Sequence, residues 1–469
     1  MTSILSKQSL ILTTFSLALT RLYYCSVTYS KIPSIANYFG TKGRYEEVNP
    51  YLLNNITLVN KSLLIPTSSE GCKPVHVTAI IRHGTRYPTV KNIKRMQGLY
   101  DLVINEASND ETWLEEIKSS WKMWYTDDMD GKLVEKGRDD HRYLAVRLSK
   151  LFPSLLSEAN LRHHRIRFQT SSKHRCVDSI EAFQQGLHKH WGLEEVWYRH
   201  EVNDKLMRFF EHCRGFVEAV ENNKTALAEV KKFKEGPEMA DVRRKMAQQL
   251  NVPYERVTPD MVEAAFLLCA YEFAIKSLHT PWCHLFDLND AKVLEYKNDL
   301  KQFWKRGHGH SINSRSSCVL FHDLFNRLEL AVQHLRLGQE LPEAVTVQVG
   351  HGETLLPLLS LLGLYKDPAP PTADNYSQQH GRSFRTSEIV PYAANMLFIL
   401  YDCRDGPRVQ FLLNETPVRF PGLTSETEVP LYSEVRQKYR ELLEGCDAQK
   451  ECEFGIRPQY RGHHGNTEL

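Results

Sequence analysis

The sequence has almost no net charge and no long hydrophobic run in its interior. Its 469 residues carry 59 basic and 57 acidic side chains, a net charge of +2, so we expect no attraction to nucleic acid through the whole-molecule field. After the first thirty residues no stretch reaches the roughly 18 apolar residues of a membrane-spanning helix. We therefore expect no stable membrane anchor.

Internal repeats and low-complexity segments are also missing from the chain, which argues against a repeat protein or a disordered one. Hydrophobic residues make up 42% of the sequence and aromatic residues 10%, enough to fill a large core. At about 150 residues per domain, the length allows two or three domains.

The N-terminus predicts export from the cytosol. The apolar run SLILTTFSLAL at 9–19 has the length of a signal-peptide core, and we interpret 1–26 as the signal peptide. This places the protein in the secretory pathway, either secreted or in the lumen of the endoplasmic reticulum. Five glycosylation sequons agree with that route. They begin at Asn55, Asn60, Asn223, Asn375 and Asn414.

The ten cysteines include no CxxC pair and no zinc-ribbon spacing, so we expect disulfides and no metal site. Cys25 falls in the predicted signal peptide, and the remaining odd number implies at least one free thiol. Sequence spacing would allow a small loop between Cys446 and Cys452, and a link between Cys269 and Cys283 across a helical turn.

Five segments have the hydrophobic pattern of buried strands, and amphipathic helical patterns alternate with the first three. This alternation predicts an α/β fold, with a mostly parallel sheet flanked by helices. The predicted strands are HVTAII (76–81), RIRFQTSS (165–172), AVTVQVG (344–350), NMLFILYDC (395–403) and RVQFLLNETPV (408–418).

The middle of the chain has a different character. Residues 191–312 contain long, charged helical patterns and no convincing strand. We predict that these residues form an all-helical domain, inserted into an α/β catalytic domain whose two parts are 27–190 and 313–469.

The segment RHGTRYPT at 82–89 carries the clearest chemical signal. It places one imidazole, His83, between the guanidiniums of Arg82 and Arg86 at the end of the first predicted strand. Guanidiniums form paired hydrogen bonds with phosphate oxygens, and a neutral imidazole nitrogen can attack phosphorus. These residue types therefore indicate chemistry on a phosphoryl group.

A second histidine follows another predicted strand. The strand at 344–350 runs into His351-Gly352-Glu353, and ligands of open α/β sheets bind beyond the carboxyl ends of the strands. We expect His83 and His351 to meet at one edge of the sheet, although more than 250 residues separate them.

With these motifs the sequence resembles the histidine acid phosphatase superfamily and, within it, the phytase-like multiple inositol polyphosphate phosphatases. The resemblance extends from YFGTKGRYEEVNPYL near residue 38, through INSRSSC at 312–318, to the HGE segment and the strands beyond it. It implies a phosphoglycerate mutase-like fold and a phosphomonoesterase that needs no metal or cofactor. The implied substrates are small polyphosphorylated molecules: phytate, lower inositol phosphates and 2,3-bisphosphoglycerate.

The resemblance also implies a role for each matching residue. His83 would be the nucleophile that forms a phosphohistidine, Glu353 would be the proton donor, and His351 would be a second catalytic histidine. The residues implied to bind the substrate phosphate are Arg82, Arg86, Thr89 and Arg175, the last from the segment TSSKHR at 170–175.

One position departs from the pattern of this branch, which usually has alanine where this chain has Gly352. A glycine loosens the backbone that directs Glu353, which would lower activity or shift its pH profile, but we expect the enzyme to remain active. Burial and nearby cations would shift the pKa of Glu353 in opposite directions, so the sequence predicts no pH optimum.

Basic residues beside the motifs favour a substrate with several phosphates. Lys91, Lys94 and Arg95 follow the first motif, and Lys173 and His174 precede the third arginine. Lys91 and Lys173 are the candidate substrate ligands among them. For Lys94 and Arg95 the alternative is a solvated helix face.

Three hypotheses for function remain open. The first is a phosphatase of the secretory pathway that acts on inositol polyphosphates. The second is a phosphoryl-transferring mutase of the same superfamily, although Glu353 argues against it because a positioned acid and base favours release of phosphate to water. The third is a catalytically weak or dead polyanion-binding protein, which would follow if Gly352 misdirects Glu353. The sequence predicts no oligomeric state.

Overall fold

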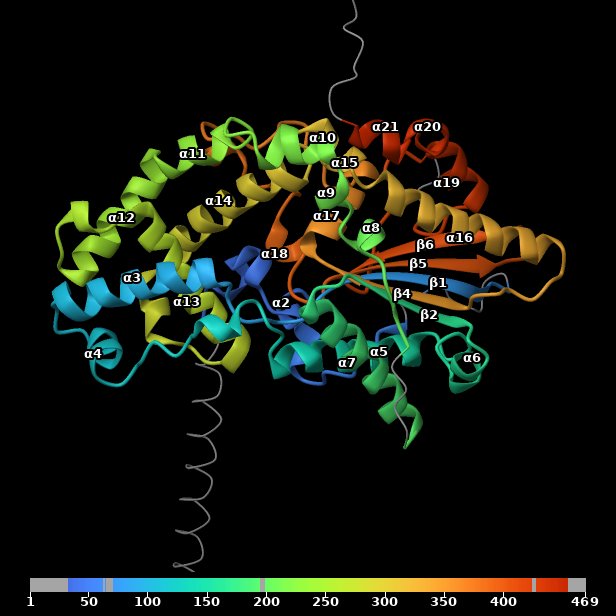
Figure 1. Cartoon of the computed structure of the whole chain (residues 1–469), viewed down its shortest axis with the longest axis horizontal. Coiled ribbons are helices and arrows are strands. Elements are labelled where there is room, and N and C mark those ends of the chain that lie inside the picture. The colour runs from blue at the N-terminus through green and yellow to red at the C-terminus, as the bar shows by residue number, and fades with distance from the viewer. Residues whose placement is uncertain (1–32, 62–63, 65–70, 195–198, 424–426, 454–469) are drawn as a thin grey trace, which may run out of the picture.

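A computed structural model describes residues 33–61, 64, 71–194, 199–423 and 427–453. In this part of the chain a seven-stranded sheet is covered by helices on both faces, and a second group of helices extends to one side of it (Figure 1). The predicted signal peptide, with Cys25, lies outside the described residues. None of the helices described is long and apolar enough to cross a membrane.

The sheet has the strand order β3-β2-β4-β1-β5-β6-β7. Strands β3, β2, β4 and β1 run parallel, whereas β5, β6 and β7 continue the sheet as antiparallel neighbours. All five predicted strands are present, and the predicted α/β class is confirmed. The strands are β1 (Lys73–Arg82), β2 (Ile166–Thr170), β3 (Glu201–Val202), β4 (Val345–Gly350), β5 (Asn395–Asp402), β6 (Arg408–Leu413) and β7 (Thr416–Pro417).

The helices fall into two groups and a set of short turns. Around the sheet lie α5 (Glu135–Leu151), α6 (Glu158–Arg162), α7 (His174–Trp191), α8 (Asp204–Met207), α9 (Phe209–His212), α10 (Arg214–Phe216), α15 (Ser311–Arg315), α16 (Cys318–Arg336), α17 (Gly352–Leu361), α19 (Tyr432–Lys438), α20 (Arg440–Gly445) and α21 (Ala448–Cys452). The second group consists of α3 (Val90–Glu106), α4 (Thr112–Ser119), α11 (Ala228–Lys234), α12 (Pro237–Leu250), α13 (Pro259–Lys276) and α14 (Leu288–Arg306). The short elements are α2 (Tyr45–Val48), α18 (Thr386–Ile389), η1 (Ala36–Tyr38), η2 (Gly40–Lys42), η3 (Pro50–Leu53), η5 (Asp127–Met129), η6 (Val217–Glu221), η7 (Tyr254–Arg256), η8 (Pro281–Leu285) and η9 (Tyr376–Gln378).

The two faces of the sheet enclose separate hydrophobic cores. On β1, Val77, Ala79 and Ile81 face the core that α5 and α7 cover, whereas Ile80 faces the core that α16 and α17 cover. Because side chains alternate along a strand, a sheet that is buried on both faces needs a continuous apolar sequence. This explains why the site-bearing strands are continuous hydrophobic runs.

A third core holds the second group of helices together. It joins α11–α14 with α3 and α4, which precede them in sequence by more than 100 residues, and with Ala36 and Phe39 near the N-terminus of the described chain. The inserted helices therefore share their core with residues from the first part of the chain. The division into an inserted domain at 191–312 and a two-part catalytic domain stays a prediction.

Four disulfides cross-link the described residues. The link between Cys269 and Cys283 is confirmed, but the predicted loop between Cys446 and Cys452 is wrong, because each of these residues pairs with a cysteine that is distant in sequence. Cys176 is a buried free thiol. Such disulfide usage is typical of secreted and lumenal proteins. The pairs are Cys72–Cys403, Cys213–Cys452, Cys269–Cys283 and Cys318–Cys446.

The loop that follows β1 is held against α5 by a close contact between two backbones. The backbone N–H and the hydroxyl of Thr85 both donate to Asp140, at 2.9 and 2.7 Å, and Asp140 also pairs with Lys136. A Cβ atom on Gly137 would lie only 2.0 Å from the carbonyl oxygen of Thr85, and one on Gly84 only 2.1 Å from that of Gly137. Both glycines are thus required for the loop to reach the helix.

We expect Gly137→Ala to destabilise the protein by about 2–3 kcal/mol, because the added methyl group must push the loop away from α5. The matched control is Gly98→Ala on α3, where an added Cβ meets nothing within 4 Å and removal of a helical glycine should stabilise by about 0.5–1 kcal/mol. Thermal and denaturant unfolding measure both effects. Equal stability of the two variants would contradict the close contact.

Candidate active site

The pairing of β1 with β4 brings the two predicted histidines together. Arg82 lies opposite Gly350 in the parallel register, so the next residue of each strand, His83 and His351, lies at the same edge of the sheet. The two buried rings are 5.7 Å apart between centroids. The rule that ligands bind beyond the carboxyl ends of the strands predicted this meeting from the sequence.

His83 is a neutral imidazole with its lone pair on Nε2. Its Nδ1 atom lies 2.9 Å from the carbonyl oxygen of Gly84, and because a carbonyl can only accept, Nδ1 carries the proton. Burial lowers the pKa of His83 well below its ordinary value, and the charges of Arg175 and Arg82 lower it further. A neutral imidazole of this kind can act as a nucleophile.

The guanidiniums of Arg82 and Arg86 are held by main-chain and aromatic groups. Arg82 donates to the carbonyl oxygens of Thr41 and Val390, at 2.8 and 2.6 Å. Arg86 donates at 3.3 Å to the hydroxyl of Tyr271 on α13. The Nε atoms of both arginines are buried without a hydrogen-bond partner among the described residues. Both side chains line the same cavity.

Arg175 and Thr89 complete the group of residues predicted to bind phosphate. Arg175 is the second residue of α7, and its Nη2 atom lies 3.3 Å from Nδ1 of His351. Thr89 directly precedes α3. A Cβ placed on Gly131 would lie 3.8 Å from both Thr89 and Arg175, and 4.0 Å from Arg86. Arg86, Thr89 and Arg175 therefore surround one loop glycine, Gly131, which no sequence motif marked.

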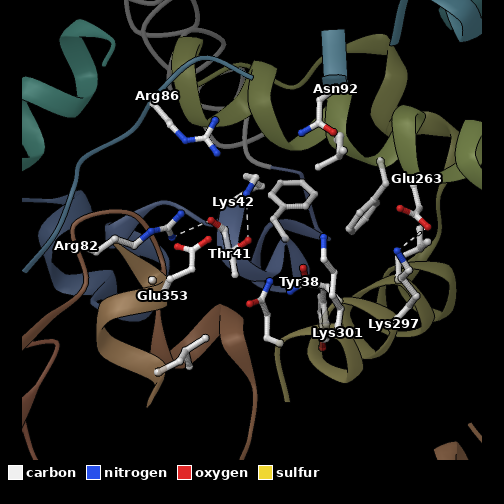
Figure 2. Close-up of a pocket in the computed structure, with 18 of the residues that line it drawn as sticks. Tyr38, Thr41, Lys42, Arg82, Arg86, Asn92, Glu263, Lys297, Lys301 and Glu353 are labelled. Atoms are coloured by element: carbon white, nitrogen blue, oxygen red, sulfur yellow. Dashed lines mark hydrogen bonds and ion pairs between the residues drawn. The ribbon is translucent and has the colours of Figure 1, made fainter. Parts of the chain in front are cut away.

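Glu353 is the second residue of α17, and its carboxyl group lies beside Arg82 at the cavity (Figure 2). Burial raises the pKa of Glu353, but the charges of Arg306 and Arg82 outweigh this effect and hold the pKa well below its usual range. The sequence predicted these opposite effects without deciding between them. In the structure the attraction to cations prevails, and Glu353 is a carboxylate.

The opposite side of the cavity carries a set of cationic side chains that no sequence motif predicted. Lys297 and Lys301 reach it from α14, and Lys42 lies between them and the arginines (Figure 2). Lys301 keeps an exposed surface, yet partial desolvation, followed by the charges of Lys297 and Lys305, lowers its pKa. Lys297 is paired with Glu263 at 2.6 Å.

The sequence contained only a weak signal for these lysines. Lys42 lies in the segment YFGTKGRYEEVNPYL, and Lys297 and Lys301 are four residues apart on one predicted helix. Lysines at that spacing share a helix face, but the same pattern is typical of a solvated face. Their proximity to the motif arises only from the packing of α14 and η2.

The basic residues that lie beside the motifs in the sequence are not the ones that form this set of cationic side chains. Lys91, in the first turn of α3, and Lys173, just before α7, are both exposed and do not line the cavity. Their role in substrate binding stays a prediction. Arg95 does line the cavity, but it is paired with Asp260 at 2.6 Å and with Glu263 at 3.1 Å.

The described residues contain no group of three or more His, Cys, Asp or Glu side chains arranged to hold a metal ion. The two histidines of the segment GHGH, His308 and His310, are half-buried. Each donates from Nε2 to a carbonyl oxygen, that of Leu364 for His308 and that of Ala226 for His310. Because a carbonyl can only accept, each Nε2 carries a proton.

Comparison with known proteins gives a consistent result. The family described as the histidine phosphatase superfamily (branch 2) matches residues 75–414. The chain is 46% identical to multiple inositol polyphosphate phosphatase 1 of Homo sapiens over 461 residues, which cover 93% of each protein. It is 44% identical to the protein of the same name from Gallus gallus, over 90% of this chain and 93% of that one.

Solved structures share the fold at much lower sequence identity. The multiple inositol polyphosphate phosphatase of Bifidobacterium longum, in complex with inositol hexasulfate, matches with a TM-score of 0.66 at 15% identity and covers 87% of this chain and 97% of that one. The phytase from D. castellii matches with a TM-score of 0.71 at 15% identity, over 89% and 87% of the two chains.

Gly352 occupies the position where the resembled branch usually has alanine, and the structure has room for the alanine methyl group. A Cβ on this residue would lie 3.8 Å from Nε of Arg82, an ordinary van der Waals contact. We expect Gly352→Ala to stabilise the protein by about 0.5–1 kcal/mol, because the helix loses a glycine. Affinity for inorganic phosphate, measured by calorimetry, should stay within about threefold of wild type. A tenfold loss would show that the methyl group displaces Arg82.

Proposed function

The chain belongs to branch 2 of the histidine phosphatase superfamily, and from this premise we propose that it hydrolyses the phosphomonoesters of inositol polyphosphates through a phosphohistidine at His83. One observation carries the assignment of His83. A neutral imidazole with its lone pair on Nε2 lies at the end of β1, with the charges of Arg175, Arg82 and Arg86 around it. The names of the two relatives above 40% identity support the substrate class.

The first chemical step is phosphoryl transfer to His83. Arg82, Arg86 and Arg175 bind the phosphate dianion and stabilise the charge on its equatorial oxygens during transfer. Nε2 of His83 attacks phosphorus in line as the bond between phosphorus and the inositol oxygen breaks. Thr89, next to Arg86 and Arg175, contributes a hydroxyl to the same phosphate.

The leaving alkoxide requires a proton, which Glu353 supplies. The cations beside Glu353 hold its pKa low, but a bound phosphate dianion neutralises the same cations and adds repulsion, so the carboxyl takes up a proton when substrate binds. Glu353 then gives that proton to the inositol oxygen. As a carboxylate it next removes a proton from the water that hydrolyses the phosphohistidine, which releases phosphate and regenerates neutral His83.

The lysines across the cavity extend this proposal to substrates with several phosphates. While the arginines hold the reacting phosphate, Lys42, Lys297 and Lys301 are placed to meet the others. Burial, followed by the charges of Arg86 and Arg82, lowers the pKa of Lys42 well below its ordinary value. An anionic group between these lysines raises their pKa and favours their charged form, so a polyanion fits this cavity better than a monoester does.

The four disulfides support the proposal that the protein functions in an oxidising compartment. Within the secretory pathway we propose the lumen of the endoplasmic reticulum or the exterior of the cell as the site of action. Immunofluorescence of the full chain in permeabilised cells, together with assay of the culture medium, distinguishes retention in the lumen from secretion.

We expect the purified glycosylated protein to release phosphate from phytate in the presence of EDTA between pH 4 and 8. His83→Ala should lower the rate by at least a thousandfold, because it removes the imidazole proposed to form the covalent intermediate. The matched control, His163→Ala, removes an exposed histidine and should leave the rate unchanged. Phytate binding without phosphate release by the wild type would instead support the polyanion-binding protein.

Lys301→Met tests the proposed role of the lysines across the cavity from the arginines. We expect the KM for phytate to rise about tenfold, since loss of one charge-assisted contact is worth about 1.4 kcal/mol or more. The KM for p-nitrophenyl phosphate, which has a single phosphate, should change by less than twofold. Lys91→Met serves as the control on the exposed face of α3, and an equal effect of that variant would favour the binding site predicted from the sequence.

A further inference from the structure

Both ring nitrogens of His351 are engaged by fixed partners. The side chain is only 3% exposed. Its Nε2 atom lies 2.9 Å from the hydroxyl oxygen of Ser171, in the turn between β2 and α7. Its Nδ1 atom lies 3.3 Å from Nη2 of Arg175. The orientation of the ring is therefore fixed from two sides.

The chemistry of these partners determines which nitrogen carries the proton. A guanidinium can only donate hydrogen bonds, so Nδ1 of His351 must accept from Arg175. The proton of the neutral ring is then on Nε2 and is donated to Ser171. Burial, followed by the charge of Arg175, lowers the pKa of His351 to about 3, which agrees with a neutral ring at physiological pH.

The hydrogen bonds continue beyond Ser171. Its hydroxyl accepts from His351 and lies close enough to the thiol of Cys176 to influence the pKa of that thiol. The Cys176 thiol in turn donates to the carbonyl oxygen of Gly350 at 3.2 Å, and its sulfur lies 3.6 Å from Nε2 of His351. Each member has one hydrogen to donate, so the chain runs in one direction, from His351 through Ser171 and Cys176 to Gly350.

This series of hydrogen bonds ends on the carbonyl oxygen of Gly350, which also contacts the backbone of the nucleophile, His83. The carbonyl oxygen of Gly350 accepts a second hydrogen bond, at 3.0 Å, from the backbone N–H of His83. One carbonyl at the end of β4 thus connects the backbone of His83 with the side chains that orient His351. Ser171 and Cys176 are both completely buried, so water does not compete for these contacts.

We propose that Ser171 and Cys176 are positioning residues that hold His351 in the neutral Nε2–H tautomer and direct its Nδ1 lone pair at Arg175. Without them a neutral imidazole can carry its proton on either nitrogen, and a proton on Nδ1 would point at a guanidinium that has nothing to accept it. These hydrogen bonds keep Arg175 beside His351. The inference rests on the proposed function, in which Arg175 binds phosphate at this place.

The tautomer can be observed directly by nitrogen NMR of the resting protein labelled with ¹⁵N-histidine, with His351 assigned by difference from His351→Asn. We expect wild type to carry the proton on Nε2. In Ser171→Ala a buried Nε2–H loses its acceptor, so the spectrum should show the ring leaving this state. Ser172→Ala, the same change at the adjacent exposed residue, should leave the signal where it is.

Activity on phytate supplies the second measurement. We expect Ser171→Ala to lower kcat/KM by ten- to a hundredfold and Ser172→Ala to change it by less than twofold. Cys176→Ala should also lower it, whereas Cys176→Ser should restore it, because a hydroxyl can accept from Ser171 and donate to Gly350. The cysteine pair carries the test if Ser171→Ala fails to fold, as judged by circular dichroism.

Two results would overturn the proposal. The first is a wild-type His351 that is protonated on Nδ1 or on both nitrogens in the resting protein. The second is a folded Ser171→Ala, or Cys176→Ala, that keeps both the wild-type tautomer and the wild-type kcat/KM. Because the NMR experiment uses no substrate, it is independent of the proposed phosphatase activity. A correct tautomer in a protein without activity would refute the proposed function and leave the positioning of His351 standing.

Discussion

The site depends on the parallel pairing of β1 with β4. Their register runs from Val77 opposite Val345 to Arg82 opposite Gly350, and it sets which residues emerge together at the edge of the sheet. Both strands are buried on both faces, so a slip of one residue would turn every side chain to the opposite core. The hydrogen bond from the backbone of His83 to Gly350 extends this register into the loop. The packing of the core thereby fixes the distance between the two histidines.

Burial of several cations beside each other is the main electrostatic cost of this arrangement. Carbonyl oxygens partly offset the cost at Arg82, and the ring of Tyr392 lies 4.6 Å from its guanidinium carbon. The Nε atoms of Arg82, Arg86 and Arg175 are nonetheless buried without a partner among the described residues. Such donors are stabilised most by an anion with several oxygens, which is the chemistry of a phosphate.

The site residues that could be predicted from the sequence lie in or beside short, recognisable sequence patterns. The strands are continuous hydrophobic runs, and the rule for strand ends was enough to place His83 near His351. The missed residues depend on packing between distant segments. Lys301 reaches the cavity because α14 packs beside the short turn η2, and Ser171 meets His351 across 180 positions. Closeness in sequence also predicted the wrong partner for Cys446, which pairs with Cys318, 128 residues away.

Glu353 shows how the second group of helices affects the chemistry at the sheet. The cation that lowers its pKa most is Arg306, at the end of α14, the helix that also carries Lys301. Arg306 is buried and is held by Glu221 at 2.7 Å. One helix therefore carries both the positive charge that most lowers the pKa of Glu353 and the lysine that we propose to meet a distant phosphate of the substrate. A phosphate that neutralises these cations raises the pKa of Glu353, and by linkage the uptake of that proton favours binding of the phosphate. The acid required by the proposed mechanism is thus formed by the substrate that needs it.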